Sequence, residues 1–249
     1  MAEPVIDILM YHRIADGTHP TRIPPAVFEA QMDAVAETGT AVISLDDLEA
    51  AARGEIVLPL RSVILTFDDA FSDFAETAWP ILKYRGFPAT VYVPTGHVGG
   101  TSSWSGAGEP APIMGWETIG DLAREGVTFG SHTVSHAALQ LLENHAIEDE
   151  LKASRSELED KLGREIRHFA PPYGRTSAAA RTLIAKHYST SVTTELGSSS
   201  LHTSRLALPR LEMYYFRRGL TWKRHLAGRG EGYIRTRKLA RRVRGLLLK

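Results

Sequence analysis

Two adjacent carboxylates follow an apolar, β-branched segment in the first third of the chain. Asp68 and Asp69 come shortly after Ser62–Thr66, which we predict to be a buried strand. Ionised carboxylates at such a place are costly unless they are paired or bind a cation. Neighbouring side chains that leave a strand point in different directions, so one can bind a cation while the other faces a substrate. The alternative is an ordinary helix start, with one of the two as N-cap.

Two histidines separated by three residues lie about sixty residues further on. His132 and His136 follow a short strand predicted at 127–130. The spacing brings both imidazoles to one helical face or into one tight loop, as a shared metal ion requires. With one carboxylate they would leave positions open for water and substrate. Such a site suits hydrolysis, because the metal lowers the pKa of its water from roughly 15.7 to about 7 and polarises a carbonyl.

A third segment, residues 168–174, reads His-Phe-Ala-Pro-Pro-Tyr-Gly and follows another predicted strand. Pro171, Pro172 and Gly174 fix a rigid turn, and its backbone amides could face an oxyanion. An ordinary proline–glycine turn is the alternative.

These segments lie in an alternation of predicted strands and helices. Strands are expected at 5–10, 62–66, 89–94, 127–130, 167–170, 188–193 and 206–213, and helices at 25–37, 45–52, 73–85, 116–125, 146–162 and 177–186. This rhythm predicts a mainly parallel sheet covered by helices, as a barrel or as an open doubly wound sheet. Periodicity does not choose between the two. Residues 96–115 are rich in Gly, Ser and Pro and are expected to form a long surface loop.

Composition excludes several classes of protein. The chain of 249 residues contains no cysteine, which rules out disulfides, thiolate zinc sites and cysteine nucleophiles. It has no apolar run of the roughly 18 residues that span a bilayer. The first residues show neither a basic region nor a long apolar stretch, so we expect no secretory signal and a cytoplasmic or membrane-peripheral location. Nothing resembles a nucleic-acid-binding module.

The zero net charge hides a strong asymmetry. Residues 217–249 hold 12 Lys and Arg against one acidic residue, whereas residues 1–216 hold 17 against 28. We therefore divide the chain into a catalytic body, 1–216, and a basic helical tail, 217–249. Leu239, Val243, Leu246 and Leu247 would share one face of a tail helix. We expect that stripe to pack on the body, and peripheral contact with an anionic membrane or a partner is the alternative.

Three motifs taken together resemble the polysaccharide deacetylase superfamily of the NodB type (carbohydrate esterase family 4). Thr-Phe-Asp-Asp at 66–69 matches its first motif, Ser-His-Thr-Val-Ser-His at 131–136 its second, and Phe-Ala-Pro-Pro-Tyr-Gly at 169–174 its third. The resemblance extends over about 5–213. It includes Met-Tyr-His-Arg-Ile at 10–14 and Leu-Pro-Arg-Leu at 208–211, which are typical of a branch that acts on exopolysaccharides.

The resemblance implies a distorted (β/α) barrel of about seven strands that hydrolyses N-acetyl, and sometimes O-acetyl, groups on sugars. It assigns Asp69, His132 and His136 to a divalent metal, commonly Zn²⁺. It makes Asp68 the general base and Tyr173 an oxyanion donor through its backbone N–H. The implied partner is an N-acetylated polysaccharide or oligosaccharide.

The sequence departs from the family pattern in two places. Many members carry an arginine that orients the base where this chain has Ala170, so Asp68 must be positioned by another group, such as Arg175 or Arg210. The family's late Leu-x-His motif, which supplies the general acid, has no clear copy here. In the branch with an early Tyr-His the first strand is implied to supply this histidine, which makes His12 the general acid. A packed histidine at a strand end is the alternative.

Pro172, Trp116 and Arg210 are predicted to contact the substrate, and Trp104 or Trp116 could stack on a sugar ring. We predict a metal-dependent deacetylase of N-acetylated sugars. Two alternatives stay open, namely a metal-dependent hydrolase of a small non-carbohydrate amide and a catalytically impaired barrel that only binds polysaccharide. The absence of an arginine at Ala170 is the sole support for the latter.

Overall fold

The computed structural model describes residues 3–104 and 109–247 and contains a closed ring of parallel strands. The strands in this part of the chain are β1 (Val5–Tyr11), β2 (Ala41–Val42), β3 (Arg61–Phe67), β4 (Thr90–Val93), β5 (Thr128–Ser131), β6 (His168–Phe169), β7 (Thr190–Leu196) and β8 (Leu208–Glu212). Seven form the ring β1-β8-β7-β6-β5-β4-β3, because β1 pairs with β3 as well as with β8. The short β2 pairs with β3 outside the ring. The predicted (β/α) barrel is confirmed.

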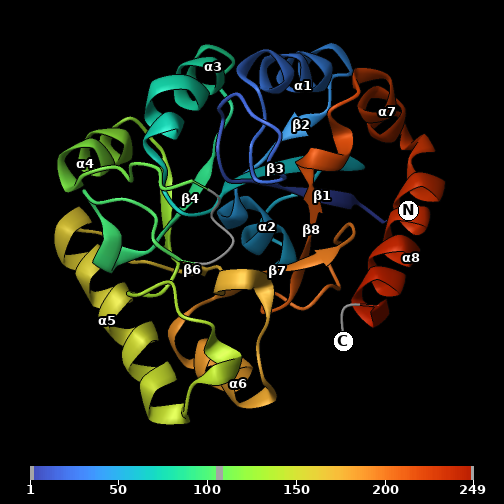
Figure 1. Ribbon diagram of the computed structural model, residues 1–249. Helices are drawn as coiled ribbons and strands as arrows, with labels where there is room; N and C mark the ends of the chain where they lie inside the picture. Colours follow the sequence, from blue (N-terminus) through green and yellow to red (C-terminus); the bar gives the residue numbers. More distant parts are fainter. Residues whose placement is uncertain (1–2, 105–108, 248–249) are drawn as a thin grey trace.

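Helices surround the ring, as Figure 1 shows. They are α1 (Pro25–Glu37), α2 (Leu45–Ala52), α3 (Trp79–Tyr84), α4 (Trp116–Arg124), α5 (Asn144–Leu162), α6 (Ala178–His187), α7 (Gly219–Arg224) and α8 (Glu231–Leu247). In this view α2 lies at the centre of the ring and the other helices lie around it. Leu45 and Leu48 of α2 pack in an inner core with Ile6, Ile8 and Ile64 of the strands. None of the helices in the described part of the chain is both long and apolar enough to cross a bilayer.

Local sequence signals account for several helix boundaries. α1 begins at Pro25, where a missing N–H costs nothing. Ser44 caps α2 by accepting a hydrogen bond from the backbone N–H of Asp47, whose carboxylate accepts one from the Ser44 N–H. The helix predicted at 73–85 is instead a π-helical turn, η1 (Phe74–Ala78), followed by α3. The two-residue strand β2 has too short a pattern to be predicted.

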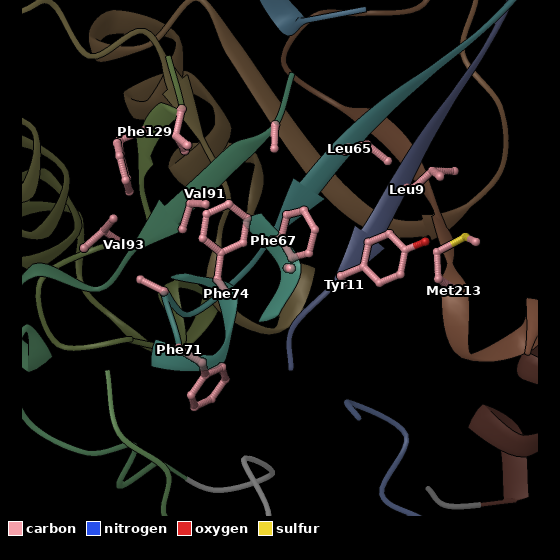
Figure 2. Packing of buried hydrophobic residues seen from close by; sticks show 14 of the residues in the cluster. Leu9, Tyr11, Leu65, Phe67, Phe71, Phe74, Val91, Val93, Phe129 and Met213 are labelled. Atoms are coloured by element: carbon pink, nitrogen blue, oxygen red, sulfur yellow. The ribbon is translucent and has the colours of Figure 1, made fainter. Parts of the chain in front are cut away.

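A second core lies between the barrel and the outer helices. Figure 2 shows side chains of neighbouring strands that contribute to it. Tyr11 of β1 stacks on Phe67 of β3 with ring centroids 5.2 Å apart, and Phe67 meets Phe74 edge-on at 4.7 Å. Because side chains alternate along a strand, residues next to these point into the barrel instead. This alternation places Met10, Thr66 and Asp68 on the inside, toward the cavity described below.

A buried ionic cluster ties the C-terminal segment to β1. Asp7 is fully buried, and its carboxylate accepts hydrogen bonds from Arg61 (Nη1–Oδ2 2.7 Å), Ser198 (Oγ–Oδ1 2.5 Å) and His225 (Nε2–Oδ2 2.9 Å). His225 begins the turn η6 (His225–Arg229), which precedes α8. Burial alone would raise the pKa of Asp7, but the hydrogen bond and charge of His225, with help from Ser198 and Arg61, lower it overall.

Replacement of Asp7 by asparagine is expected to reduce the free energy of unfolding by about 3–5 kcal/mol at pH 7, because Arg61 and His225 lose their counter-charge. Since the folded pKa of Asp7 lies below its unfolded value, its contribution is present above about pH 4 and is lost as the pH falls through the folded pKa. In urea titrations the deficit should therefore be smaller at pH 3 than at pH 7. Asp121→Asn, which removes an exposed partner of Arg124, is the matched control. Equal deficits in the two variants at pH 7 would contradict this account.

The C-terminal helix does not present its apolar stripe to the barrel. The side chains of Leu239 and Val243 are 63% and 47% exposed, so the packing that we expected from the sequence is wrong for these two residues. Those of Leu246 and Leu247 lie outside the described side chains. Contact of α8 with an anionic membrane stays a prediction. The first turns of α8 are attached through the buried Ile234 and through the Tyr233 hydroxyl, which donates to the Tyr215 carbonyl at 2.6 Å.

Candidate active site

A cavity of about 400 Å³ opens at the carboxyl ends of the strands. His12 follows β1, Asp68 and Asp69 follow β3, and His132 follows β5. Carboxyl ends of parallel strands meet at one edge of a barrel, so residues distant in sequence come together there. The rest of the wall is formed by Met10, Thr21, Phe71, Trp104, His136, Pro171, Tyr173, Gly174, Arg175, Thr194, Glu212 and Arg241.

Asp69, His132 and His136 form a compact group of possible metal ligands. Asp69 Oδ1 lies 3.4 Å from His132 Nε2 and 3.1 Å from His136 Nε2. All three residues are buried, and Asp69 Oδ1 accepts no hydrogen bond within the described part of the chain. Two ligand atoms that each lie about 2.1 Å from one tetrahedrally coordinated ion are about 3.4 Å from each other. The spacing of these atoms therefore fits a single divalent ion.

The surroundings of the group favour ligation. The Nδ1–H of His132 donates to the Ala170 carbonyl at 2.6 Å, which leaves the lone pair of Nε2 facing Asp69 in the neutral ring. The ring of His136 stacks on Trp104 with centroids 4.1 Å apart. Burial alone would raise the pKa of Asp69, yet the two imidazoles lower it overall, and Asp69 stays ionised.

Three residues of the site have left-handed backbone conformations that non-glycine residues rarely adopt. The φ angles are 75° for Asp69, 56° for His136 and 60° for Tyr173. Each such residue costs roughly 1–2 kcal/mol, and such strain concentrates at functional sites. These conformations turn the loops after β3, β5 and β6 into the same cavity.

The guanidinium of Arg210 positions the carboxylate of Asp68. Its Nη1 and Nη2 atoms donate to Oδ1 and Oδ2 of Asp68, both at 2.7 Å, in the two-pronged geometry that suits a carboxylate. Nε donates to the Thr193 carbonyl at 3.0 Å, which fixes the guanidinium plane. Burial alone would raise the pKa of Asp68, but the charge and hydrogen bonds of Arg210 lower it overall. Arg210 is 1% exposed and does not line the cavity, so the structure replaces the predicted substrate contact with the positioning of Asp68.

His12 lines the same cavity and lies close to Asp68. Its Nε2 lies 3.9 Å from Asp68 Oδ2, and its side chain is 19% exposed. His12 Nδ1 is buried and has no hydrogen-bond partner among the described residues. His12 thus lines the cavity, whereas the alternative of a packed strand-end histidine would place its ring among core residues.

Of the other residues predicted to belong to the site, some line the cavity and others pack within the fold. Tyr173 lines the cavity and meets His136 edge-on at 5.0 Å, whereas Pro172 is buried beneath the turn. Trp116 begins α4, packs beside Lys161 and does not line the cavity, so its predicted substrate contact is not supported. Trp104 lines it instead. Arg175 lines the cavity but forms no ion pair with Asp68 in the described structure.

Two charged lining residues were not predicted from the sequence. Glu212 ends β8, where burial raises the pKa of its carboxyl. Arg241 comes from α8, in the segment assigned to a separate tail. Its signal in the sequence is the recurrence of cations at 235, 238, 241 and 242, one turn of helix apart.

A second group of possible ligands has a simpler explanation. Asp46, Glu49 and His168 also lie close together. Arg167 already contacts both carboxylates, with Nη1 3.0 Å from Asp46 and Nη2 2.7 Å from Glu49, and it supplies the positive charge that they need. We regard this group as an ion-pair cluster of the fold.

A seven-stranded (β/α) barrel with a carboxylate pair and two histidines at the carboxyl ends of its strands is a hydrolase scaffold with a candidate metal centre. The polysaccharide deacetylase family model matches residues 57–192, which is more than half of the chain. The chain therefore belongs to the polysaccharide deacetylase family, and the protein is a deacetylase.

Similar proteins cover most of the barrel. The chain is 25% identical over 209 residues to the "Putative polysaccharide deacetylase YxkH" of Bacillus subtilis, a match that covers 84% of this chain and 71% of that protein. The structure of the Streptococcus pyogenes deacetylase PplD in complex with acetate is 27% identical, with a TM-score of 0.73 and coverage of 84% and 92%. IcaB from Ammonifex degensii, at 22% identity, shares the fold with a TM-score of 0.78 over 91% of this chain and 97% of its own.

Proposed function

We propose that the protein removes acetyl groups from the amino groups of an N-acetylated polysaccharide or oligosaccharide with the help of a divalent ion, most simply Zn²⁺. The observation that carries the proposal is the convergence of Asp69, His132 and His136 beside a carboxylate that Arg210 holds ionised. A donor set of two imidazoles and one carboxylate is typical of catalytic zinc. The Escherichia coli poly-beta-1,6-N-acetyl-D-glucosamine N-deacetylase, 30% identical over 91 residues (35% of this chain and 13% of that protein), supports the substrate class.

The side chains can divide the chemistry among them. Bound by Asp69, His132 and His136, a zinc ion would supply a Lewis acid that activates water and polarises the acetyl carbonyl. Asp68, ionised beside Arg210, takes the proton from the attacking water. The backbone N–H of Tyr173 would donate to the oxygen on which negative charge develops.

His12 completes the proposed reaction as the general acid. The water oxygen forms a bond to the acetyl carbon, the carbon–nitrogen bond breaks, and acetate leaves. The departing nitrogen needs a proton, and His12, which lines the cavity close to Asp68, would give it.

Acetate release from N-acetylglucosamine oligomers by zinc-loaded protein, beside an Asp68→Asn variant, tests the proposal. Release by the wild type and not by the variant is the expected result. It would establish the reaction and the base together, because the amide keeps the shape of the carboxylate but accepts no proton. A zinc-loaded wild type that releases no acetate from any N-acetylated sugar would refute the proposal.

Replacement of His12 by alanine is expected to cut kcat at least about tenfold and to leave the zinc content unchanged, because the residue lies outside the ligand group. The matched control is His97→Ala, which removes an imidazole that meets Trp104 edge-on and does not itself line the cavity. Steady-state rates and metal analysis of the purified variants measure both effects. Near-normal turnover in His12→Ala would refute the assignment of the general acid.

A further inference from the structure

Two further hollows extend the active-site cavity along α8. The first, of about 330 Å³, shares Gly174, Thr194 and Arg241 with the active-site cavity. The second, of about 360 Å³, shares Lys238 with the first and reaches the amino ends of β1 and β3. The three hollows therefore follow one another along α8, which lines each of them. Together we call them the α8 groove.

Cations of α8 face this groove. Arg235, Lys238, Arg241 and Arg242 line it at spacings of three and four residues, which place them on one side of a helix. Among the residues that the structure describes, Arg235 has a salt bridge with Glu231, at 3.3 Å, whereas the other three have none. Each unpaired cation thus keeps its charge available to a ligand.

The orientation of α8 is the reverse of what hydrophobicity alone would produce. An amphipathic helix normally packs its apolar stripe on the protein and turns its cations to water. Here Leu239 and Val243 are exposed, and Lys238 lies across Gly197, where an added Cβ would be 3.2 Å from Nζ. The anchored Ile234 fixes this orientation from the first turns of the helix.

The acidic residues are concentrated at the two ends of the groove. Asp68, Asp69 and Glu212 line the active-site cavity, Glu231 lines the far hollow, where it is paired with Arg235, and Glu195 lines the middle hollow. The middle hollow therefore has three cations against one acid. From Arg235 to Arg241 the helix rises by about 9 Å, so a ligand that contacts both ends must be longer than one sugar ring.

We propose that the α8 groove binds a negatively charged part of the substrate, so that the preferred substrate is an N-acetylated glycan bearing carboxylate or phosphate groups. This inference rests on the proposed function and specifies its substrate class. With the acetamido group at Asp69 and His132, the neighbouring sugars extend past Arg241 toward Lys238. Like charges that line a concave surface reinforce one another and attract an oppositely charged ligand more strongly than the same charges scattered over a flat surface.

The test compares oligosaccharides of equal length. One alternates N-acetylglucosamine with glucuronic acid, one is an N-acetylglucosamine oligomer with a terminal phosphate, and one is the neutral oligomer. Acetate release gives kcat/KM for each, and calorimetry with the Asp68→Asn variant gives binding without turnover. The groove variant is Lys238→Gln/Arg242→Gln. The matched control is Arg224→Gln/Arg229→Gln, which removes the same charge from exposed positions that line none of these hollows.

We expect the wild type to prefer at least one anionic substrate over the neutral one by about tenfold or more, and we expect salt to reduce this preference. The groove variant should lose most of the preference and the control should keep it. Comparison of the glucuronic acid oligomer with the phosphate-bearing oligomer identifies which anion is recognised. Equal rates and affinities for neutral and anionic oligomers, or a preference that survives in the groove variant, would overturn the inference while leaving the deacetylase proposal intact. Absence of turnover on every substrate, with groove-dependent binding of the anionic oligomer to Asp68→Asn, would instead overturn the proposed reaction alone.

Discussion

Replacement of Arg210 by glutamine is expected to lower kcat by at least about 100-fold without loss of bound zinc. Arg210 makes both hydrogen bonds to Asp68 and supplies the main positive charge that lowers its pKa. Without it, burial raises the pKa of Asp68, and the proposed base is protonated or turned away from its water. The zinc content should persist, because Arg210 contacts none of the three proposed ligands.

The same change also leaves a buried carboxylate unpaired, which costs about 3–5 kcal/mol and requires controls. Arg210→Lys keeps the charge but loses the two-pronged contact, so it should be partly active. The double variant Asp68→Asn/Arg210→Gln removes both charges, so it should unfold at higher denaturant than Arg210→Gln while staying inactive. Kinetics, metal analysis and urea unfolding separate these effects. A folded Arg210→Gln variant with normal kcat would show that Asp68 needs no positioning.

The role of Arg210 illustrates what could be predicted from the sequence. The absence of an arginine at Ala170 required a substitute, and Arg175 and Arg210 were the two candidates. Spacing could not choose between them, because Arg210 is 142 positions from Asp68 along the chain. The choice is made by the closure of the barrel, which pairs β1 with both β3 and β8 and brings the inward side chains of these strands together. With Arg210 in this role, the binding-only alternative loses its sole support.

The elements themselves were predicted well, because their signals are local. Pro25, Ser44 and Ser177 mark helix starts through the contacts of a single turn. The continuous apolar runs of β1 and β3 likewise need no information from elsewhere. Barrel closure is different, since an open sheet of the same strands has the same periodicity. The family resemblance, and not the pattern, distinguished them.

The errors arose where tertiary contacts override a local pattern. Trp104 and Trp116 are equally aromatic and both border the long loop, yet only Trp104 stacks on His136 and lines the cavity. The apolar stripe of the last helix predicted a face that packs on the barrel. Ile234 and Tyr233 instead anchor α8 in a rotation about its own axis that leaves Leu239 and Val243 exposed. The periodicity of a helix shows which residues share a face, but it does not show what that face packs against.

Removal of zinc is expected to abolish acetate release, and replacement of His132 by alanine should make this loss permanent. Dialysis against a chelator should inactivate the wild type, and one equivalent of Zn²⁺ per chain should restore it, because Asp69, His132 and His136 form one site. His132→Ala leaves two donors and removes the imidazole fixed by Ala170, so added zinc should not restore its activity. The control is His202→Ala, at an exposed position, which should behave as the wild type.

Thermal unfolding gives a readout that is independent of turnover. Zinc that binds only the folded chain stabilises it by about 4 kcal/mol at a thousandfold excess over Kd, so Tm should rise for the wild type and for His202→Ala but not for His132→Ala. Zinc-dependent stabilisation that survives in His132→Ala would place the ion elsewhere, and the group of Asp46, Glu49 and His168 would be the next candidate. Retained acetate release in the fully chelated wild type would remove the metal from the mechanism and leave Asp68 and His12 as an acid–base pair acting alone.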